Sequence, residues 1–345
     1  MGLKFKDIVE KEEISIKDLR GKILAVDSMN LLYQFLTTIR SVDGSVLTDK
    51  HGKVTSHLIG LFNRTTSLME QGLKLAFVFD GTPPSIKEKT WEIRKAVKHQ
   101  ASLKLKEAED ADDYAEMKKQ AGRTAVLTKE MVVDAKNLLT ALGVPIIQAP
   151  SEGEAQTAYM VAQGKAYASI SQDYDNLIFG CPTLIRNLSI EGKRRKTGTL
   201  GYVNIKPEVI KLNDVLKTLK INLNQLIVLA ILAGTDYNPG GVKGIGPKKG
   251  LKLIQEFGED FDAIFEKVEW NQQYPDLTWK EIFDTIKDIP VTNDFDLEWK
   301  KIDEQEIMAL LVEKHDFSED RVKTKLEALK RENKELSQKG LSSFF

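Results

Sequence analysis

The feature that most constrains the fold is a repeated order of strand-like and helix-like segments. Residues 22–36 give an apolar strand that ends at Asp27 and then a helical pattern that Ser28 could cap, and residues 54–84 give a helix and then the β-rich run LKLAFVF. Residues 128–180 return to the same order, with VPIIQAP and AYASISQD as strands. Strands that alternate with helices of this length predict βαβ units and a mainly parallel sheet, an α/β fold.

Composition excludes several protein classes. The chain has 345 residues, of which 41% are hydrophobic, so it can bury a full core in one large or two medium domains. It has no apolar run of 18 residues and no secretory h-region at its start, which predicts a cytoplasmic protein without membrane spans. Cys181 is the single cysteine, which excludes an internal disulfide framework and a cysteine zinc site.

Aspartates follow the apolar strand-like runs. Asp27, Asp80 and Asp173 each stand at the end of such a run, and ligands of open α/β sheets bind at the carboxyl ends of the strands. Asp175 adds a fourth acid, because residues i and i+2 of an extended segment point the same way. We therefore expect these carboxylates to converge on one edge of the sheet.

Three further acids belong to the same expectation. Glu152 and Glu154 follow the strand VPIIQAP, and Asp236 follows the apolar helix LIVLAILAG. A purely structural interpretation exists for the glutamates, because Ser151 and Glu154 have the spacing of a helix capping box. That interpretation explains Glu154 well and Glu152 only in part.

Seven carboxylates that converge on one edge need cations, because they otherwise raise each other's pKa. The hard cation Mg²⁺ fits such a site, and two ions about 4 Å apart would clamp a phosphodiester and activate water. No histidine is placed to join the cluster, which argues against zinc. We expect one of Glu152 and Glu154 to bind metal directly and the other through water. The run VFDGT resembles the DxDGT motif of haloacid-dehalogenase phosphatases, but Val78 replaces their nucleophile.

Positive charge gathers after Asp80. Residues 87–106 carry seven lysines and arginines against two glutamates. Lys87 and Arg94 are two helical turns apart and would face the same way, so they could hold the scissile phosphate. The plainer interpretation is a solvated helix face. A charged insertion beside an active site also suggests a lid that orders on binding.

A glycine-rich loop lies in the run VKGIGPKKGLKLI, residues 242–254. It stands between two helical patterns, and helix N-terminal amides beside such a loop can meet a phosphate. Pro247 stands where a Walker loop needs its lysine. The residues expected to grip a DNA backbone are Lys243, Gly244, Gly246, Lys248 and Lys249.

These segments together resemble the archaeal flap endonucleases of the xeroderma-pigmentosum-group-G family of structure-specific 5′ nucleases. The blocks that carry the resemblance are AVDSMNLLYQFL, FVFDGTPPSIK, APSEGEAQTAY, SQDYDNLIFG and LAGTDYNPGGVKGIGPKKGLKLI. Gly153 and Gly240–Gly241 depart from the family pattern at positions that are not ligands. The resemblance implies a PIN-like core with a helical arch and a helix–two-turn–helix. The segments are 1–83 and 130–222 for the core, 84–129 for the arch, 223–258 for the helix–two-turn–helix, 259–336 for a C-terminal helical region and 337–345 for a tail.

The resemblance also implies roles for individual residues. The seven acids hold two Mg²⁺, for which Mn²⁺ can substitute, and the helix–two-turn–helix can hold K⁺. Lys87 and Arg94 stand at the base of the arch. Tyr33 stacks on a nucleobase, with core packing as the alternative for that side chain. The chain ends without the basic extension of eukaryotic relatives, so we expect an archaeal source. We also expect the protein to be a monomer when free.

The tail QKGLSSFF looks detached from the domain and fits a sliding-clamp-binding pattern. Gln338, Leu341, Phe344 and Phe345 hold its four positions, and exposed apolar anchors at a polar terminus mark an interaction site. The partner implied is the clamp PCNA, and the alternative is a tail folded onto its own domain.

The sequence therefore predicts a 5′ flap endonuclease with 5′-3′ exonuclease activity in replication and repair. It would act on 5′-flap and double-flap DNA. The alternatives are a PIN-type RNA endonuclease and a non-catalytic, clamp-bound junction adaptor.

Overall fold

A mixed, mainly parallel sheet forms the centre of the molecule. The computed structural model describes residues 3–41, 45–111, 113, 116, 120, 124–190, 192–195 and 202–342. Within these ranges seven strands form one sheet in the order β1-β9-β6-β5-β2-β3-β4. Strands β6, β5, β2, β3 and β4 are mutually parallel, β9 is antiparallel to both of its neighbours, and β1 therefore runs in the same direction as β6. The predicted α/β class is confirmed. The strands are β1 (Glu12–Glu13), β2 (Ile23–Asp27), β3 (Lys74–Phe79), β4 (Ile146–Gln148), β5 (Ala168–Ile170), β6 (Thr183–Arg186) and β9 (Glu208–Lys211), and β7 (Gly192–Arg195) pairs with β8 (Tyr202–Ile205).

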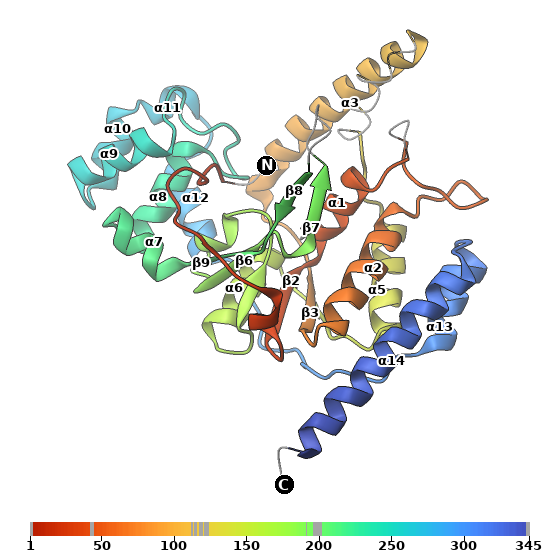
Figure 1. Cartoon of the computed structure of the whole chain (residues 1–345). Helices are drawn as coiled ribbons and strands as arrows, with labels where there is room; N and C mark the ends of the chain where they lie inside the picture. Colours follow the sequence, from red (N-terminus) through yellow and green to blue (C-terminus); the bar gives the residue numbers. More distant parts are fainter. Residues whose placement is uncertain are drawn as a thin grey trace.

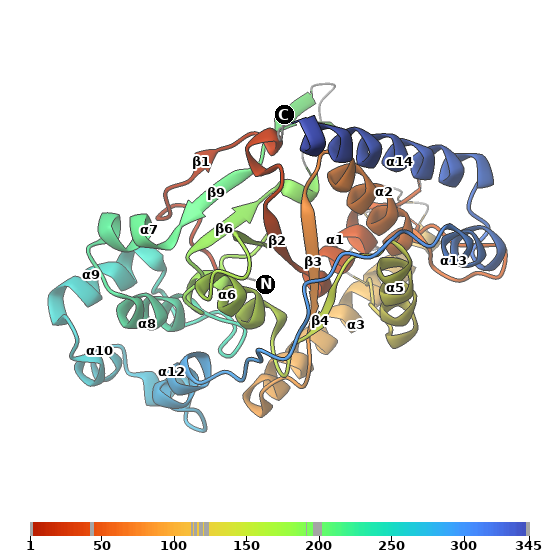
Figure 2. The same cartoon turned by 90° about the horizontal axis from the view of Figure 1, so that it is seen from below.

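Helices cover both faces of the sheet, and a further group of helices lies to one side of it (Figures 1 and 2). The helices α1, α2 and α5 pack on one face and α6 on the other, while α7 to α12 form a separate helical group with its own core. The helices are α1 (Ser28–Thr38), α2 (Ser56–Glu70), α3 (Glu88–Asp110), α5 (Lys129–Ala141), α6 (Gly153–Ala162), α7 (Leu212–Leu219), α8 (Leu223–Ala233), α9 (Pro247–Phe257), α10 (Phe261–Lys267), α11 (Trp270–Gln273), α12 (Trp279–Lys287), α13 (Glu304–Met308) and α14 (Glu319–Ser342). Short helical turns are η1 (Ile16–Leu19), η2 (Ser85–Lys87), η3 (Asp175–Leu177), η4 (Leu188–Ile190) and the π-helix η5 (Ala309–Lys314).

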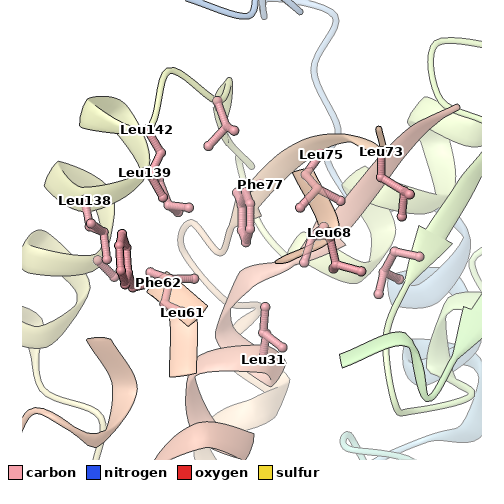
Figure 3. Close-up of a cluster of buried hydrophobic side chains, with 14 of the residues drawn as sticks. Leu31, Leu61, Phe62, Leu68, Leu73, Leu75, Phe77, Leu138, Leu139 and Leu142 are labelled. Atoms are coloured by element: carbon pink, nitrogen blue, oxygen red, sulfur yellow. The ribbon is translucent and has the colours of Figure 1, made fainter. Parts of the chain in front are cut away.

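Side-chain size differs between the two faces of the central strands. Leu75 and Phe77 of β3 enter the large cluster beneath α1, α2 and α5, which Figure 3 shows. Ala76 and Val78 of the same strand face α6, where small residues predominate. Successive residues of a strand point to opposite faces of the sheet. The run KLAFVF therefore places large side chains on the face covered by α1, α2 and α5 and smaller ones on the face covered by α6.

Two local expectations from the sequence were wrong. Asp27, rather than Ser28, caps α1, because its carboxylate accepts a hydrogen bond from the backbone N–H of Asn30. Strand β5 ends at Ile170, so Asp173 lies in a turn after the strand instead of at its last position. Both differences come from aspartate, whose short side chain bonds to nearby backbone and ends regular structure.

An extended strap, residues 289–303, interrupts the C-terminal region for which the sequence predicts helix throughout. It runs from α12 across the molecule to α13 (Figure 2). The side chain of Gln156 exchanges two hydrogen bonds of 2.8 Å with the backbone of Thr292, and the indole of Trp299 donates to the carbonyl of Leu75 at 3.0 Å. Bonds to other elements replace the helical ones, so a polar sequence becomes an ordered, non-helical connection.

The end of the chain is helical further than expected. Helix α14 continues through Ser342 and thus includes the first five residues of the segment that looked detached. The structure does not describe the side chains that follow Arg331. The residues Phe344 and Phe345 lie wholly outside the part of the chain that it describes. Figure 1 shows α14 ending on the side of the molecule opposite to α3.

No single helix in the described ranges is long and apolar enough to cross a membrane. The helices α7 and α8 meet the length and composition criterion only together, and they are bent by 79°.

Candidate metal centre

Three carboxylates form the centre of the site. One oxygen from each of Glu154, Asp173 and Asp175 lies within 4.8 Å of the others. Glu154 belongs to the first turn of α6, and Asp175 opens the 3₁₀ turn η3. Asp173 and Asp175 therefore converge as the sequence predicts, but through a turn rather than through an extended segment.

Two further aspartates come from adjacent parallel strands. Asp27 ends β2, and its Oδ2 accepts a hydrogen bond from the hydroxyl of Ser171 at 3.4 Å. Asp80 follows β3, and its Oδ1 accepts from the N–H of Gly153 at 2.7 Å. Because β2 lies between β3 and β5, the carboxyl ends of the three strands bring Asp27, Asp80 and Asp173 to one edge.

The proposed capping box is wrong. Helix α6 begins at Gly153, with Glu152 as the N-cap residue and no side-chain hydrogen bond at the cap. The carboxylate of Asp80, from a different strand, takes the helix N–H instead. A Cβ at position 153 would lie 2.7 Å from that carboxylate, so a larger residue there would displace the side chain of Asp80 or the start of the helix.

Lys87 joins the cluster from the base of α3. Its Nζ lies 2.6 Å from Oε1 of Glu152 and 3.8 Å from Oδ2 of Asp236. The hydroxyl of Thr90 donates to the carbonyl of Asp236 at 2.6 Å, which ties the start of α3 to the loop after α8. The arrangement puts a positive charge beside the acids, where the sequence predicts it.

Burial and mutual repulsion raise the pKa of these acids. The pKa of Asp27 rises to about 8 because the carboxyl is buried and because Asp80 and Asp173 are close. The pKa of Asp175 also rises to about 8, through burial and the charges of Asp236 and Asp173. Burial and then Asp175 raise the pKa of Glu154 well above its usual value. Such a set holds protons at neutral pH unless cations replace them.

Arg186 of β6 holds the loop that carries Asp173 and Asp175 through contacts with the neighbouring residues of that loop. Its Nε donates to the carbonyl of Gln172 at 2.9 Å and its Nη1 to the hydroxyl of Tyr174 at 2.5 Å, while the guanidinium lies 4.1 Å from the centre of the Tyr174 ring. These three contacts hold the residues on both sides of Asp173.

Sequence reasoning missed several donors to the acids. The amide of Asn30 donates to Oδ2 of Asp173 at 2.6 Å, the N–H of Leu3 donates to Oδ1 of Asp175 at 3.0 Å, and Ser171 bonds to Asp27. The first turn of the helix after Asp27 places Asn30 near the strand ends, but its side-chain bond to Asp173 has no signal in the sequence. Leu3 gave no signal, because it is 172 residues away from its partner in the chain.

The other predicted residues have mixed placements. Tyr33 is half-buried on α1, and its hydroxyl donates to the carbonyl of Ala125 at 3.3 Å. The side chain of Arg94 lies outside the described ones. The loop between α8 and α9 and the first turn of α9 expose the predicted residues, namely Lys243, Gly244 and Gly246 in the loop and Lys248 and Lys249 in the helix.

Close packing supports the loop between α8 and α9. Gly244 adopts a φ of +78°, and Gly246 is the N-cap residue of α9. A Cβ at Gly250 would lie 2.8 Å from Leu229, and one at Gly241 would lie 2.4 Å from the backbone of Gly234. The two helices therefore approach closely, as a helix–two-turn–helix requires.

The donor set fits a hard divalent cation. Three carboxylates within 4.8 Å offer oxygen ligands, and the surrounding acids raise one another's pKa. Mg²⁺ and Mn²⁺ prefer oxygen ligands of this kind.

Comparisons with known proteins identify the family to which this chain belongs. The XPG N-terminal domain matches residues 1–101, and the XPG I-region matches residues 143–236. A flap endonuclease 1 from Pyrococcus horikoshii is 50% identical over all of this chain and 98% of its own length, and that of Staphylothermus marinus is 48% identical over all of both. The chain belongs to the flap endonuclease family. Its activity is structure-specific endonuclease cleavage at flaps, the hydrolysis of phosphodiesters, and the family is metal-dependent.

Solved structures show the same fold. The flap endonuclease-1 from Methanococcus jannaschii has a TM-score of 0.75 and 42% identity, covering 96% of this chain and 98% of its own. The catalytic core of Rad2 with a DNA substrate has a TM-score of 0.69 at 24% identity, over 95% of this chain and all of its own, and shares the fold. The PIN-like architecture expected from the flap endonuclease resemblance is thus confirmed.

Proposed function

We propose that this enzyme removes 5′ flaps from DNA at the junction of single strand and duplex, using two Mg²⁺ held by Asp27, Asp80, Glu152, Glu154, Asp173, Asp175 and Asp236. The observation that carries the proposal is the group formed by Glu154, Asp173 and Asp175 at the base of α3. Mn²⁺ would substitute for Mg²⁺. We expect Glu154 to bind metal directly and Glu152, which pairs with Lys87, to act through water.

The chain's own residues divide the work of hydrolysis. When bound, the cations supply Lewis-acid stabilisation to the phosphodiester. Lys87 holds a positive charge against Glu152 and Asp236, and its pKa is raised by these acids although burial alone would lower it. It thus stays charged at working pH and offsets charge that develops on the phosphate. Arg94, two turns further along α3, would act from the same face, and Tyr33 would stack on a base beside the junction.

Duplex DNA would lie against the loop between α8 and α9. The exposed lysines at 243, 248 and 249 and the N-terminus of α9 supply contacts to phosphates without reading bases. We expect K⁺ to bind in the same loop. The Rad2 catalytic core, which shares this fold, has been solved in complex with a DNA substrate, and this supports binding of branched DNA here.

The C-terminal tail would recruit the sliding clamp PCNA through Gln338, Leu341, Phe344 and Phe345. The pattern of a glutamine, an aliphatic residue and two aromatic residues supports this role. We expect the enzyme to be a monomer when free and to work in the cytoplasm, in Okazaki-fragment maturation and repair, with 5′-3′ exonuclease activity beside flap cleavage.

Cleavage of a 5′-labelled double-flap DNA tests the proposal. Wild type with Mg²⁺ should release a short labelled product at the junction, and EDTA or Asp173→Asn should reduce the rate by at least about 100-fold. Asp214→Asn, which changes an exposed aspartate on α7, is the matched control and should cut normally.

The alternatives give different outcomes in the same assay. Faster cutting of the corresponding RNA flap would favour the PIN-type RNA endonuclease. Tight binding of the DNA flap by wild type without any product would favour the adaptor. Equal rates for wild type and Asp173→Asn would show that the acids do not hold the catalytic metal.

A further inference from the structure

The amino ends of the central strands carry a basic surface on the side of the molecule away from the acids. It consists of Arg20, Lys22, Lys74 and Tyr167, with Lys165 beside them, and we call it the basic face. All five side chains are exposed. Lys22 precedes β2, Lys74 begins β3, and Tyr167 precedes β5. The strands that carry Asp27, Asp80 and Asp173 near their carboxyl ends thus begin beside lysines.

Backbone contacts show that these residues are neighbours. Lys74 N–H donates to the carbonyl of Lys22 at 3.1 Å, Tyr167 N–H donates to that of Ile23 at 2.8 Å, and Gly21 N–H donates to that of Gly72 at 2.8 Å. The basic face is therefore one continuous surface, built on hydrogen-bonded strand ends rather than on separate loops.

Two lysines of the basic face rest on aromatic rings. Nζ of Lys22 lies 5.0 Å from the centre of the Tyr167 ring, and Nζ of Lys74 lies 5.5 Å from that of Trp299 in the strap. Cation–π contacts of this kind contribute about 0.5–1 kcal/mol at exposed sites. They fix where the ammonium groups stand on the surface.

The cations of the basic face are not paired within the described part of the chain. Arg20, Lys22, Lys74 and Lys165 form no ion pair there. Glu70 pairs instead with Lys325 of α14 at 3.2 Å, while Asp18 accepts from the N–H of Ser15 and keeps its charge. The strap adds the exposed Glu298, which is next to Trp299 in the chain.

The C-terminal helix leads past this surface. The pair of Lys325 with Glu70 places α14 beside the turn that precedes Lys74, and the helix continues to Ser342. At 1.5 Å per residue the remaining 17 residues reach about 25 Å beyond that pair. Figure 1 shows the end of α14 on the side of the molecule opposite to α3.

We propose that the basic face is a second docking surface, which receives an acidic surface of the same protein partner that holds the C-terminal tail. The inference rests on the clamp partner proposed above. A partner held by the tail approaches this side of the molecule, and charge complementarity would then orient the enzyme on it. DNA on the catalytic side would stay accessible, because the two surfaces lie at opposite ends of the strands.

Binding to the purified sliding clamp tests the inference. Dissociation constants from calorimetry at two salt concentrations would be compared for wild type, Lys22→Gln/Lys74→Gln, and Phe344→Ala/Phe345→Ala. The matched control is Lys217→Gln/Lys287→Gln on α7 and α12, where both lysines are exposed and Lys287 also rests on a ring, that of Phe283 at 5.4 Å.

We expect the Lys22/Lys74 variant to bind the clamp about three- to tenfold more weakly, with a shallower salt dependence. Its flap cleavage without the clamp should be unchanged, and the control should match wild type in both assays. The tail variant could lose clamp binding while the Lys22/Lys74 variant binds the clamp with wild-type affinity. That result would overturn the docking role of the basic face and leave the tail proposal intact.

Two other results would also decide the matter. Wild-type affinity of the tail variant would remove the tail proposal and, with it, the reason for a partner on this side. Weaker binding of free double-flap DNA by the Lys22/Lys74 variant would show that the surface contacts nucleic acid instead, which contradicts the inference.

Discussion

Three carboxylates of the metal centre are oriented by donors from other parts of the chain. Asn30 bonds to Asp173, Leu3 to Asp175, and Gly153 to Asp80. Each donor bonds to one carboxylate oxygen and leaves the other oxygen, or a second lone pair, available to a cation. Such donors fix the direction of metal ligands and are as necessary as the ligands themselves.

Gly153→Ala tests the contact with Asp80. The new Cβ would lie 2.7 Å from Oδ1, so Asp80 must turn away or the helix must shift. We expect Mg²⁺-dependent cleavage to fall by roughly tenfold or more, as for other losses of ligand orientation, while Tm changes little because alanine favours a helix.

Gly164→Ala is the contrasting variant at the other end of α6. It meets no atom within 4 Å but has a φ of +67°. It should lower Tm and leave the rate per folded molecule unchanged. Wild-type cleavage by Gly153→Ala would show that Asp80 does not need this orientation.

Arg186→Ala tests the support of the loop that carries Asp173 and Asp175. Without the bonds to Gln172 and Tyr174 the two carboxylates lose their fixed spacing. We expect the Mg²⁺ concentration for half-maximal cleavage to rise about 10- to 100-fold, with much of the rate recovered at high Mg²⁺. Arg331→Ala, at an arginine whose side chain is 79% exposed, is the control. A lower Tm without a change in Mg²⁺ dependence would indicate a purely structural role.

At the scale of elements, the helices α8 and α9 present a loop whose shape depends on glycine packing and on one lysine. Gly241 and Gly250 let the helices approach, and the ammonium of Lys249 donates to the carbonyl of Gly244 at 3.0 Å. Lys248 can therefore be changed for its charge alone, whereas Lys249 also bonds to the loop.

Lys248→Ala/Lys249→Ala tests the contribution of charge at this loop. Double-flap DNA should bind more weakly, and the slope of log K against log salt should decrease by about 0.9 for each phosphate that the loop no longer neutralises. The cleavage position should not move, because the metal centre is unchanged. Lys129→Ala, an exposed lysine at the start of α5, is the control. An unchanged salt slope would contradict contact between this loop and the DNA backbone.

Elements with a strong repeating pattern were predictable, and those that depend on distant partners were not. Apolar periodicity marks the runs around α2 and β3, and these runs put Asp80 at the correct edge. The two-residue strand β1 exists because it pairs with β9, nearly 200 residues later. The strap could not be predicted, since nothing in its sequence reveals the bonds to Gln156 and Leu75. The acids could be found from sequence because strand ends imply an edge, but their donors could not.

At the scale of the whole molecule, concentrated negative charge opposes folding when no cation is present. Asp27 and Asp175 each have a pKa of about 8 in the folded protein, against a usual value of 3.8. Between these values the folded state holds protons that the unfolded state has released. Stability is therefore fully present at low pH and falls as pH rises toward 8.

The metal-free enzyme should accordingly lose thermal stability between about pH 6.5 and 8. The slope can reach about 1.4 kcal/mol per pH unit for each additional proton that the folded state holds. The lowered pKa of buried His57, about 4, acts below this window. Saturating Mg²⁺ should remove the slope, and Asp175→Asn should reduce it, as measured by Tm in metal-free buffer. A flat profile without metal would contradict the raised pKa values.

The core beneath the catalytic sheet is completed by the last helices. Ile307, Leu311, Leu326 and Leu329 pack into the same cluster as Leu24 and Phe77, although the strap carries the chain across the molecule before they arrive. During synthesis, the residues before α13 therefore leave the ribosome without the side chains that close their own core. The nuclease becomes fully folded only when α14 has emerged, immediately before the tail. Competence to cut thus appears only at the end of translation.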